Sequence, residues 1–303
     1  MQNAERIDRG LGRVSSIGCV VCGGKEAKLL WKERLPETID ASQFSYKGNK
    51  KFHGRIVECS DCRHRYVAPI PMCADSFYAA VEDEFYLETE EYRVQTFAEF
   101  LDFKERFAPK RGSLLDIGCY TGVFLSVAKK RGYSVAGTEL SSWAAGIARS
   151  RGFDVVELPV EQLDEQEQFD NISAFDVFEH LEDPRSAAEI VCKKLKKGGC
   201  FFATVPDMHS WHTKILGEHH WLVILMHYHY FNARNFRSML LSAGFSRVDV
   251  YQSPPYRLPL NRVRNWAKGT PLSFIFQILG RLPIVRNLEI RLRASLYAIC
   301  YND

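Results

Sequence analysis

Short apolar runs alternate with amphipathic helical patterns between residues 110 and 250. The short runs predict strands, and the apolar positions that recur every three to four residues predict helices. This alternation is typical of a parallel sheet covered by helices, so we predict an α/β fold with a doubly wound, mostly parallel sheet. The expected strands span residues 113–117, 134–139, 154–157, 169–175, 200–205 and 246–251, and the expected helices span residues 123–131, 143–151, 186–195 and 232–243.

The regions on either side of this α/β domain (residues 109–251) have other compositions. Residues 1–75 contain two C-x-x-C pairs and predict a small zinc-ribbon-like domain. Residues 76–108 are acidic and aromatic, and their apolar positions at helical spacing predict a helical connector. Residues 252–303 hold eight Lys or Arg against two acids.

Apolar residues of the C-terminal region lie on one helical stripe, so residues 252–303 are predicted to form a basic amphipathic helical tail. The tail either docks on its own domain or contacts a membrane surface or a lipid-linked substrate. The stripe consists of Ile284, Leu288, Leu292, Leu296 and Ile299, flanked by Arg286, Arg291 and Arg293.

The overall composition is that of a globular protein. The 303 residues are 46% hydrophobic and 25% charged, with a net charge of +3, which does not mark a nucleic-acid binder. No apolar run approaches the roughly 18 residues that a spanning helix needs, and residues 1–6 do not begin a secretory signal. We therefore expect a cytoplasmic protein, with peripheral membrane contact through the tail as an additional possibility. The odd number of nine cysteines argues against a disulfide framework.

A glycine turn follows the first predicted strand of the α/β domain. Residues 114–122 read LLDIGCYTG, which is an apolar strand containing Asp116 and then a turn with Gly118 and Gly122. The spacing G-x-x-x-G differs from the pyrophosphate-binding fingerprint and lacks the Lys of a phosphate loop. A nucleoside ligand without phosphates fits better. Glu139 ends the second strand, where a carboxylate can accept hydrogen bonds from ribose hydroxyls.

This turn, the distant acid and the later sequence FEHLEDP (residues 178–184) resemble class I S-adenosylmethionine-dependent methyltransferases. The likeness covers residues 95–250 and is greatest to the ubiquinone-biosynthesis-type and glycan-cluster branches. It implies that Asp116 orients the amino-acid portion of S-adenosylmethionine and that Asp176 borders the methyl donor. The implied cofactor-binding residues are Asp116, Gly118, Cys119, Tyr120, Gly122, Glu139, Leu140, Val160, Glu161 and Asp176, with Val160 and Glu161 near the adenine.

Tyr120 departs from the pattern of that family, which usually has glycine at this position. If the position requires a positive φ, tyrosine is strained there. The substitution would weaken cofactor binding or cap the pocket.

Two cysteine pairs have the spacing of zinc knuckles. Four thiolates can form a closed tetrahedral shell around a structural zinc ion. The 36 residues between the pairs exceed the usual separation, so a loop or additional strands must fill the gap. The four predicted ligands are Cys19, Cys22, Cys59 and Cys62.

Histidines follow the fourth and fifth strands of the α/β domain. His180 is our candidate general base for a hydroxyl acceptor, with Glu179 beside it; the alternative is that His180 caps a helix or shapes the cofactor wall. The later histidines either line an acceptor pocket, are partly solvated or bind a second metal. These are His209, His212, His219, His220, His227 and His229.

Together with these residues, the resemblance implies methyl transfer from S-adenosylmethionine to a hydroxyl, or to a carbon, of a sugar, a glycan intermediate or another small metabolite. An RNA methyltransferase with a zinc module is one alternative. Against it, no Asn/Asp-Pro-Pro-Tyr/Phe sequence follows the fourth strand, and residues 253–256 (SPPY) come too late in the chain. The other alternative is a non-catalytic module that retains the cofactor pocket. The oligomeric state stays open.

Overall fold

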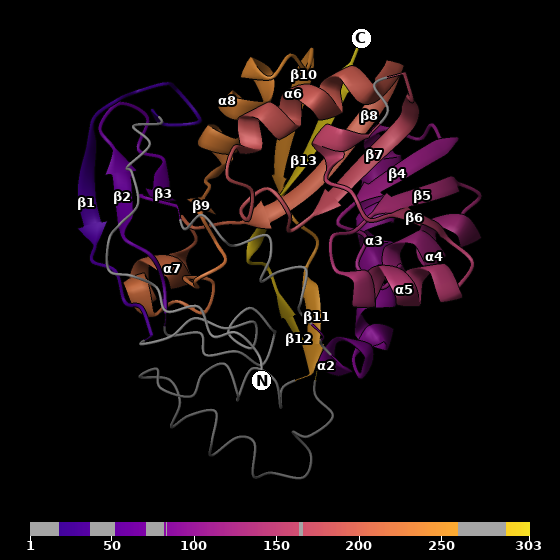
Figure 1. The fold of residues 1–303 in the computed structure, drawn as a ribbon, viewed down its shortest axis with the longest axis horizontal. Helices are drawn as coiled ribbons and strands as arrows, with labels where there is room; N and C mark the ends of the chain where they lie inside the picture. The colour runs from indigo at the N-terminus through magenta and orange to yellow at the C-terminus, as the bar shows by residue number, and fades with distance from the viewer. Residues whose placement is uncertain (1–17, 37–51, 71–81, 83, 164–165, 260–288) are drawn as a thin grey trace.

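The computed structural model describes residues 18–36, 52–70, 82, 84–163, 166–259 and 289–303. Its largest element is a seven-stranded sheet with the order β10-β13-β8-β7-β4-β5-β6 (Figure 1). Neighbours from β8 to β6 are parallel, which confirms the α/β prediction. The strands are β4 (Ser113–Ile117), β5 (Ser134–Thr138), β6 (Asp154–Val156), β7 (Phe169–Phe175), β8 (Leu195–Pro206), β10 (Arg247–Gln252) and β13 (Ser295–Asn302).

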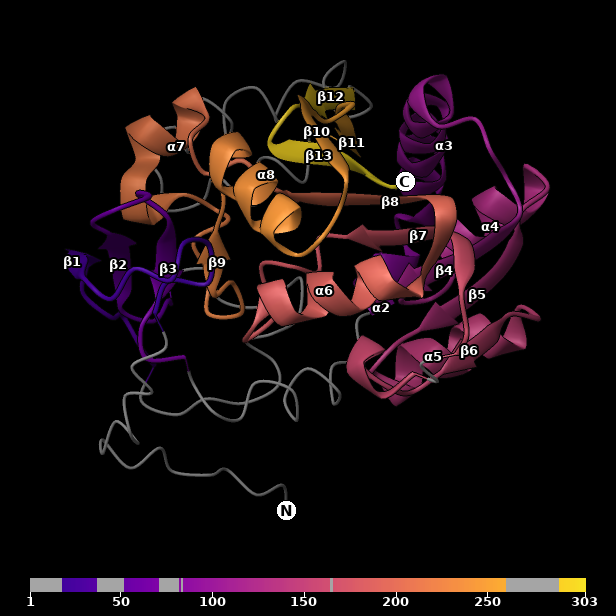
Figure 2. The ribbon, with the colours of Figure 1, turned by 90° about the horizontal axis from the view of Figure 1, so that it is seen from above.

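Helices cover both faces of this sheet (Figures 1 and 2). On one face, α6 (Pro184–Lys194) and α8 (Ala233–Ser242) share a buried core with β7 and β8. On the other face, α3 (Glu90–Phe107), α4 (Val123–Lys130) and α5 (Ser142–Ser150) form a second core with the sheet. The shorter helices are α2 (Glu84–Leu87), α7 (Trp211–Leu216), η2 (Val160–Gln162) and η3 (Gly217–His219).

Local sequence explains where the helices begin. Asp183 caps α6 by accepting the backbone N–H groups of Arg185 and Ser186, and Pro184 follows at the first helical position. Ser141 caps α5 and Asn232 caps α8 in the same way. Side chains of this kind satisfy N–H groups that have no partner inside the helix. The predicted and observed bounds agree within a few residues, except that β8 begins at Leu195 and not at Cys200.

The C-terminal strand β13 contradicts the predicted helical tail. Leu296 and Ile299, two residues of the expected stripe, are buried within β13, which pairs antiparallel with both β8 and β10. A central strand is covered on both faces, so its apolar residues form a nearly continuous run. Such a run also contains apolar residues at helical spacing, so the pattern does not distinguish a strand from a helix. Leu292 belongs to β12 (Glu289–Leu292), which pairs with β11 (Tyr256–Pro259). Ile284 and Leu288 lie outside the described residues.

A separate four-stranded sheet contains the cysteine pairs. Its order is β1-β2-β3-β9, from β1 (Ala27–Trp31), β2 (Ile56–Cys59), β3 (Arg65–Val67) and β9 (His229–Tyr230). Because β9 comes from the segment after β8, the N-terminal strands are paired with a strand that the α/β region supplies. This sheet lies at the end of the molecule away from β5 and β6 (Figures 1 and 2).

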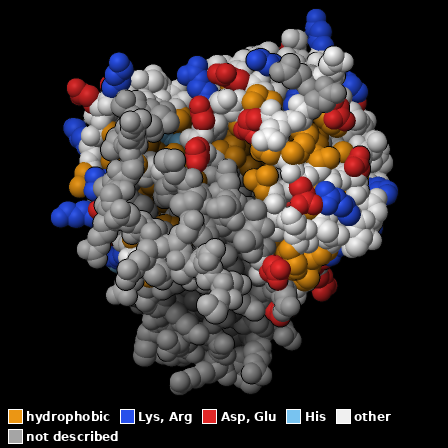
Figure 3. Space-filling view, viewed as in Figure 1, with side chains coloured by type: hydrophobic (Ala, Val, Ile, Leu, Met, Phe, Trp, Pro, Cys, Tyr) orange, Lys and Arg blue, Asp and Glu red, His pale blue; other side chains and the backbone are white. Residues whose placement is uncertain are grey.

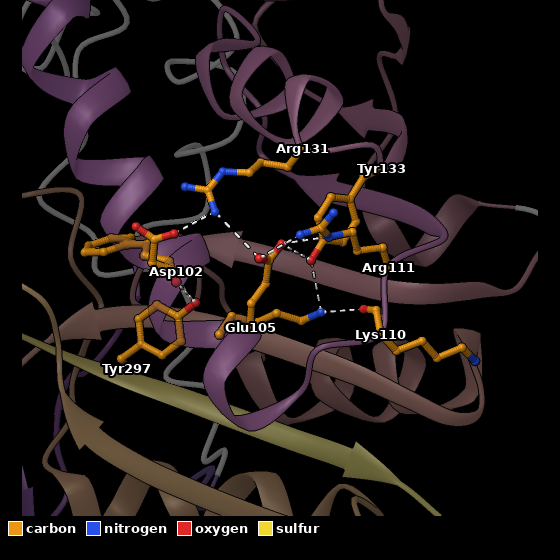
Figure 4. Close-up of polar contacts among 9 residues, drawn as sticks. Asp102, Glu105, Lys110, Arg111, Arg131, Tyr133 and Tyr297 are labelled. Atoms are coloured by element: carbon orange, nitrogen blue, oxygen red, sulfur yellow. Dashed lines mark hydrogen bonds and ion pairs between the residues drawn. The ribbon is translucent and has the colours of Figure 1, made fainter.

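Polar contacts fasten α3 to the amino ends of β4 and β5 (Figure 4). Arg131 contacts Asp102 and Glu105, and the Tyr133 hydroxyl donates to Glu105. Beneath them, the fully buried Lys104 ammonium donates to the Lys110 carbonyl and to the Tyr133 hydroxyl. Burial lowers the pKa of Lys104 to about 8. These contacts stabilise the edge opposite the carboxyl ends of the strands.

Two further observations concern the distribution of charge on the surface and the length of the helices. Among the described residues on the face shown in Figure 3, Lys and Arg side chains are interspersed with Asp and Glu around apolar groups. Within the described part of the chain, no helix is long and apolar enough to cross a membrane.

Candidate functional site

Three acidic side chains stand at the carboxyl edge of the seven-stranded sheet. Asp116 lies in β4, Glu139 directly follows β5, and Asp176 directly follows β7. Because β7, β4 and β5 are parallel neighbours, their carboxyl ends lie side by side. Ligands of open α/β sheets bind at this edge. The fold therefore brings together acids that are far apart in the sequence.

The turn after β4 requires its two glycines. Gly118 has φ +67° and Gly122 has φ +78°, in the left-handed region that side chains disfavour. A Cβ at Gly118 would come within 2.9 Å of a Val177 methyl, and one at Gly122 within 2.9 Å of the Phe153 ring. The turn is fixed to the next strand because the Cys119 N–H donates to the Thr138 carbonyl over 2.9 Å.

Tyr120 adopts φ +48°, so the position does require the backbone conformation that glycine favours. Such a conformation costs about 1–3 kcal/mol in a residue with a side chain. Two contacts offset the strain: the Tyr120 N–H donates to Glu139 Oε2 over 2.9 Å, and its ring packs edge-on against Tyr86, with centroids 4.3 Å apart. Tyr120 thus places an aromatic ring at the glycine turn, partly covered by Tyr86.

Glu139 and Asp116 are both buried at this edge. Glu139 accepts the backbone N–H groups of Tyr120 and Ser141, and Asp116 accepts the Ser173 hydroxyl over 2.7 Å. Burial nevertheless raises the pKa of Glu139 and raises that of Asp116 to about 8. A ligand that brings hydrogen-bond donors or positive charge to this edge would favour the ionised forms.

Asp176 is held by two residues that come later in the chain. It has φ +55°, and its carboxylate accepts hydrogen bonds from Thr204 Oγ1 (2.9 Å) and from the Tyr256 hydroxyl (2.8 Å). Burial raises its pKa, and the hydrogen bonds from Tyr256 and Thr204 and the charge of Arg93 oppose only part of this rise. The Arg93 guanidinium carbon lies 3.5 Å from the Tyr86 ring centroid.

Tyr86, Arg93 and Tyr256 were missed by the sequence analysis. Only the SPPY run pointed to Tyr256, and it had been set aside because it came late in the chain.

Glu179 and His180 follow Asp176 in the turn after β7. Glu179 is fully buried, and burial raises its pKa well above the usual value. His180 Nε2 lies 4.0 Å from Glu179 Oε1, and its Nδ1–H donates to the Met226 carbonyl over 2.8 Å. Burial lowers the pKa of His180 to about 4, so the ring is neutral near pH 7.

The other predicted cofactor residues occupy separate positions. Leu140 is half-buried directly after Glu139. Val160 is buried in the core that also contains Ile117, and Glu161 is exposed beside it in η2. Contact of Val160 and Glu161 with an adenine stays a prediction.

The four cysteines of the N-terminal sheet come together as predicted. Their sulfur atoms all lie within 4.8 Å of one another. Cys19 Sγ is 3.5 Å from Cys62 Sγ, and Cys22 Sγ is 3.6 Å from Cys59 Sγ. Around a zinc ion with Zn–S bonds of about 2.3 Å, tetrahedral thiolates stand roughly 3.8 Å apart. The two short separations lie slightly below this value, and the four thiols are close enough to surround one zinc ion.

The later histidines separate into several pairs. His212 and His220 contact each other over 2.8 Å and stack with Trp221. His229 of β9 contacts His64, which directly precedes the neighbouring strand β3, over 3.2 Å, while His227 packs edge-on against His180. The contacts of these histidines are thus made in pairs with different partners, and a shared acceptor pocket stays a prediction.

Comparison with known proteins supports the geometry. Residues 89–250, more than half of the chain, match the family model described as "Methyltransferase domain". The chain belongs to this methyltransferase-domain family. The chain is 30% identical over 117 residues to a ubiquinone biosynthesis O-methyltransferase of Idiomarina loihiensis, covering 35% of this chain and 48% of that protein. A protein of the same name from Paracidovorax citrulli is 28% identical over 116 residues, covering 35% and 49%.

Solved structures confirm the fold of this methyltransferase domain. An S-adenosylmethionine-dependent methyltransferase of Thermotoga maritima superimposes with a TM-score of 0.50 at 20% identity, covering 73% of this chain and 94% of that chain. One from Archaeoglobus fulgidus gives 0.50 at 17%, covering 72% and 99%. The predicted Rossmann-like methyltransferase fold is thus confirmed. The chain spans about half the length of the curated relatives that it matches.

Proposed function

We propose that this protein transfers the methyl group of S-adenosylmethionine to a hydroxyl of a sugar, a glycan intermediate or another small metabolite, with a carbon acceptor as the close variant. The observation that carries the proposal is the placement of Asp116, Glu139 and Asp176 at adjoining carboxyl ends of the sheet, beside a strained glycine turn. Strain of this kind is concentrated at functional sites.

The residues at this edge fit the proposed cofactor. Glu139 can accept hydrogen bonds from ribose hydroxyls in place of those from the backbone N–H groups. Asp116 and Asp176 can form ion pairs with the positively charged amino group. Among the described residues, the buried Thr121 hydroxyl has no hydrogen-bond partner, so a polar ligand at the turn could provide one. The bound cofactor would supply an electrophilic methyl group whose sulfur leaves neutral, and the work of the protein is to align donor and acceptor.

The acceptor is proposed to lie beside Asp176, near Glu179 and His180. The Nδ1–H of His180 is committed to the Met226 carbonyl, which leaves the Nε2 lone pair on the side of Glu179. The names of the curated relatives specify methylation at oxygen, which favours a hydroxyl over a carbon. The glycan class comes from the resemblance to glycan-cluster enzymes.

Transfer of labelled methyl groups into a fractionated lysate tests this function. We expect label in a fraction of small polar metabolites or glycans, in a bond that is stable to base as an ether is. Label in RNA would support the alternative acceptor class. Tight cofactor binding without label in any fraction would contradict catalysis and favour a non-catalytic module.

We also propose that Cys19, Cys22, Cys59 and Cys62 hold a structural zinc ion. Support comes from the sulfur separations of 3.5 and 3.6 Å and from the closed count of four thiol ligands, which leaves no position for a reacting water molecule. In this location the ion would fix β2 and β3 relative to each other.

A further inference from the structure

A second group of metal-ligating side chains lies next to the proposed acceptor position. Glu179 and His180 come from the turn after β7, and His227 comes from the segment before β9. One ligand atom from each of the three lies within 4.8 Å of the other two. Backbone hydrogen bonds hold the two segments together, because the Glu179 carbonyl accepts the N–H groups of Tyr228 (2.7 Å) and His229 (3.1 Å).

Both imidazoles of this group are oriented by backbone carbonyls. His180 Nδ1 contacts the Met226 carbonyl over 2.8 Å, and His227 Nδ1 contacts the Leu222 carbonyl over 2.9 Å. A carbonyl only accepts, so the proton of each ring is on Nδ1 and the lone pair is on Nε2. Metal-binding histidines show this arrangement, in which the second ring nitrogen donates to a carbonyl or carboxylate.

Glu179 supplies a carboxyl group at the same place, and a bound cation would favour its ionised form. Its side chain is 0% exposed, and neither carboxylate oxygen has a hydrogen-bond partner among the described residues. A buried carboxylate without such partners is costly, and a cation offsets that cost. The distance from Glu179 Oε1 to His180 Nε2 is 4.0 Å. Tetrahedral ligands about 2.1 Å from an ion stand roughly 3.4 Å apart, so these two atoms would draw together by about half an ångström around a bound ion.

We propose that Glu179, His180 and His227 bind a divalent transition-metal cation, with Zn²⁺ as the leading candidate. Two imidazoles and one carboxylate suit this class of ion and leave at least one coordination position open. The His180 side chain remains 18% exposed, so the site has a side open to solvent or to an acceptor. The inference extends the proposed function, because a cation here would polarise an acceptor hydroxyl next to Asp176.

Titration of the full chain with Co²⁺ tests the site, because cobalt reports its ligands in its visible spectrum. Glu179→Gln and His227→Gln each remove one ligand with little change in volume. His219→Gln is the matched control, since His219 belongs to the same segment but its side chain is 56% exposed and outside the group. Cobalt bound by the cysteines would show thiolate-to-metal charge-transfer bands. Cys22→Ser removes one of these thiolates and so distinguishes that cobalt from cobalt at the proposed site.

We expect the wild-type protein and His219→Gln to bind one Co²⁺ ion whose spectrum lacks thiolate bands. The Kd of this ion should rise at least 100-fold in Glu179→Gln and in His227→Gln. The Cys22→Ser variant should retain this ion. Equal Co²⁺ binding in all five proteins, or bands from thiolates alone, would overturn the proposal. Calorimetry with S-adenosylhomocysteine on the same variants shows whether they are folded, and failure of that ligand to bind the wild type would count against the methyltransferase function separately from the cation site.

Discussion

The Tyr256 hydroxyl donates to the Asp176 carboxylate over 2.8 Å, although 80 residues separate the two in the chain. Tyr256 begins β11, and β12 and β13 follow before the end of the chain. The C-terminal region, which the sequence predicted to be a separate tail, therefore completes both the sheet and the polar surroundings of Asp176.

Removing this hydroxyl is expected to weaken the binding of S-adenosylhomocysteine. Hydrogen bonds to charged groups contribute about 1.5–3 kcal/mol, so Tyr256→Phe should raise Kd roughly 10- to 100-fold in calorimetry. Tyr301→Phe is the matched control, because Tyr301 lies on β13 and its hydroxyl contacts the Phe107 carbonyl away from Asp176. An equal change in both variants would show that Tyr256 has no special relation to the site.

Asp116→Asn should stabilise the protein while weakening its cofactor binding. Burial raises the pKa of Asp116 to about 8, so the folded wild type binds more protons than the unfolded chain between about pH 4 and pH 8. Its free energy of unfolding therefore falls as the pH rises through that window. We expect Asp116→Asn to be more stable by about 5 kcal/mol at pH 8 and to match the wild type near pH 4. Urea unfolding at both pH values measures this difference, and a constant difference would contradict it.

Lys104 should make stability rise with pH in the alkaline range. Its pKa is lowered from 10.5 to about 8 by burial, so the unfolded chain binds more protons between those values. The stability of the wild type relative to Lys104→Met should therefore increase by roughly 2 kcal/mol from pH 8 to pH 10. Comparison with the variant cancels the titration of buried cysteines and tyrosines. Lys193→Met, at an exposed position, should show no such trend.

The sequence predicted those parts of the structure that depend on local pattern. Each of these parts has a periodicity or a residue spacing that is visible within one short segment. They are the parallel strands, their helices, the glycine turn and the cysteine pairs. The antiparallel β13 was missed because a strand buried on both faces has no alternation, and its apolar positions also fit a helix.

The contacts around Asp176 and Glu179 could not be predicted in the same way. Tyr256, Arg93 and His227 reach these acids from segments that only the completed fold brings near. His227 was one of six histidines with no local feature to distinguish it. Its pairing with His180 depends on the Met226 and Leu222 carbonyls.

Loss of the predicted zinc should destabilise the N-terminal sheet more than the α/β domain. Removing one thiolate from a closed site leaves the remaining three without a full shell, so Cys22→Ser should hold one zinc per chain less than the wild type and lose several kcal/mol of unfolding free energy in that sheet. Metal analysis and hydrogen exchange of residues 56–67 measure the two effects. Cys192→Ser, a buried cysteine outside the cluster, should keep the zinc content of the wild type. A zinc content in Cys22→Ser equal to that of the wild type would contradict the assignment.

The most direct test of the cofactor site is calorimetric titration of the full chain with S-adenosylhomocysteine, in the wild type and in Glu139→Ala. We predict one site per chain in the wild type and a Kd at least 10-fold higher in the variant, because the ribose loses its acceptor and the turn loses its bond to the Tyr120 N–H. Absence of binding to the wild type, or equal affinity in the two proteins, would contradict the account.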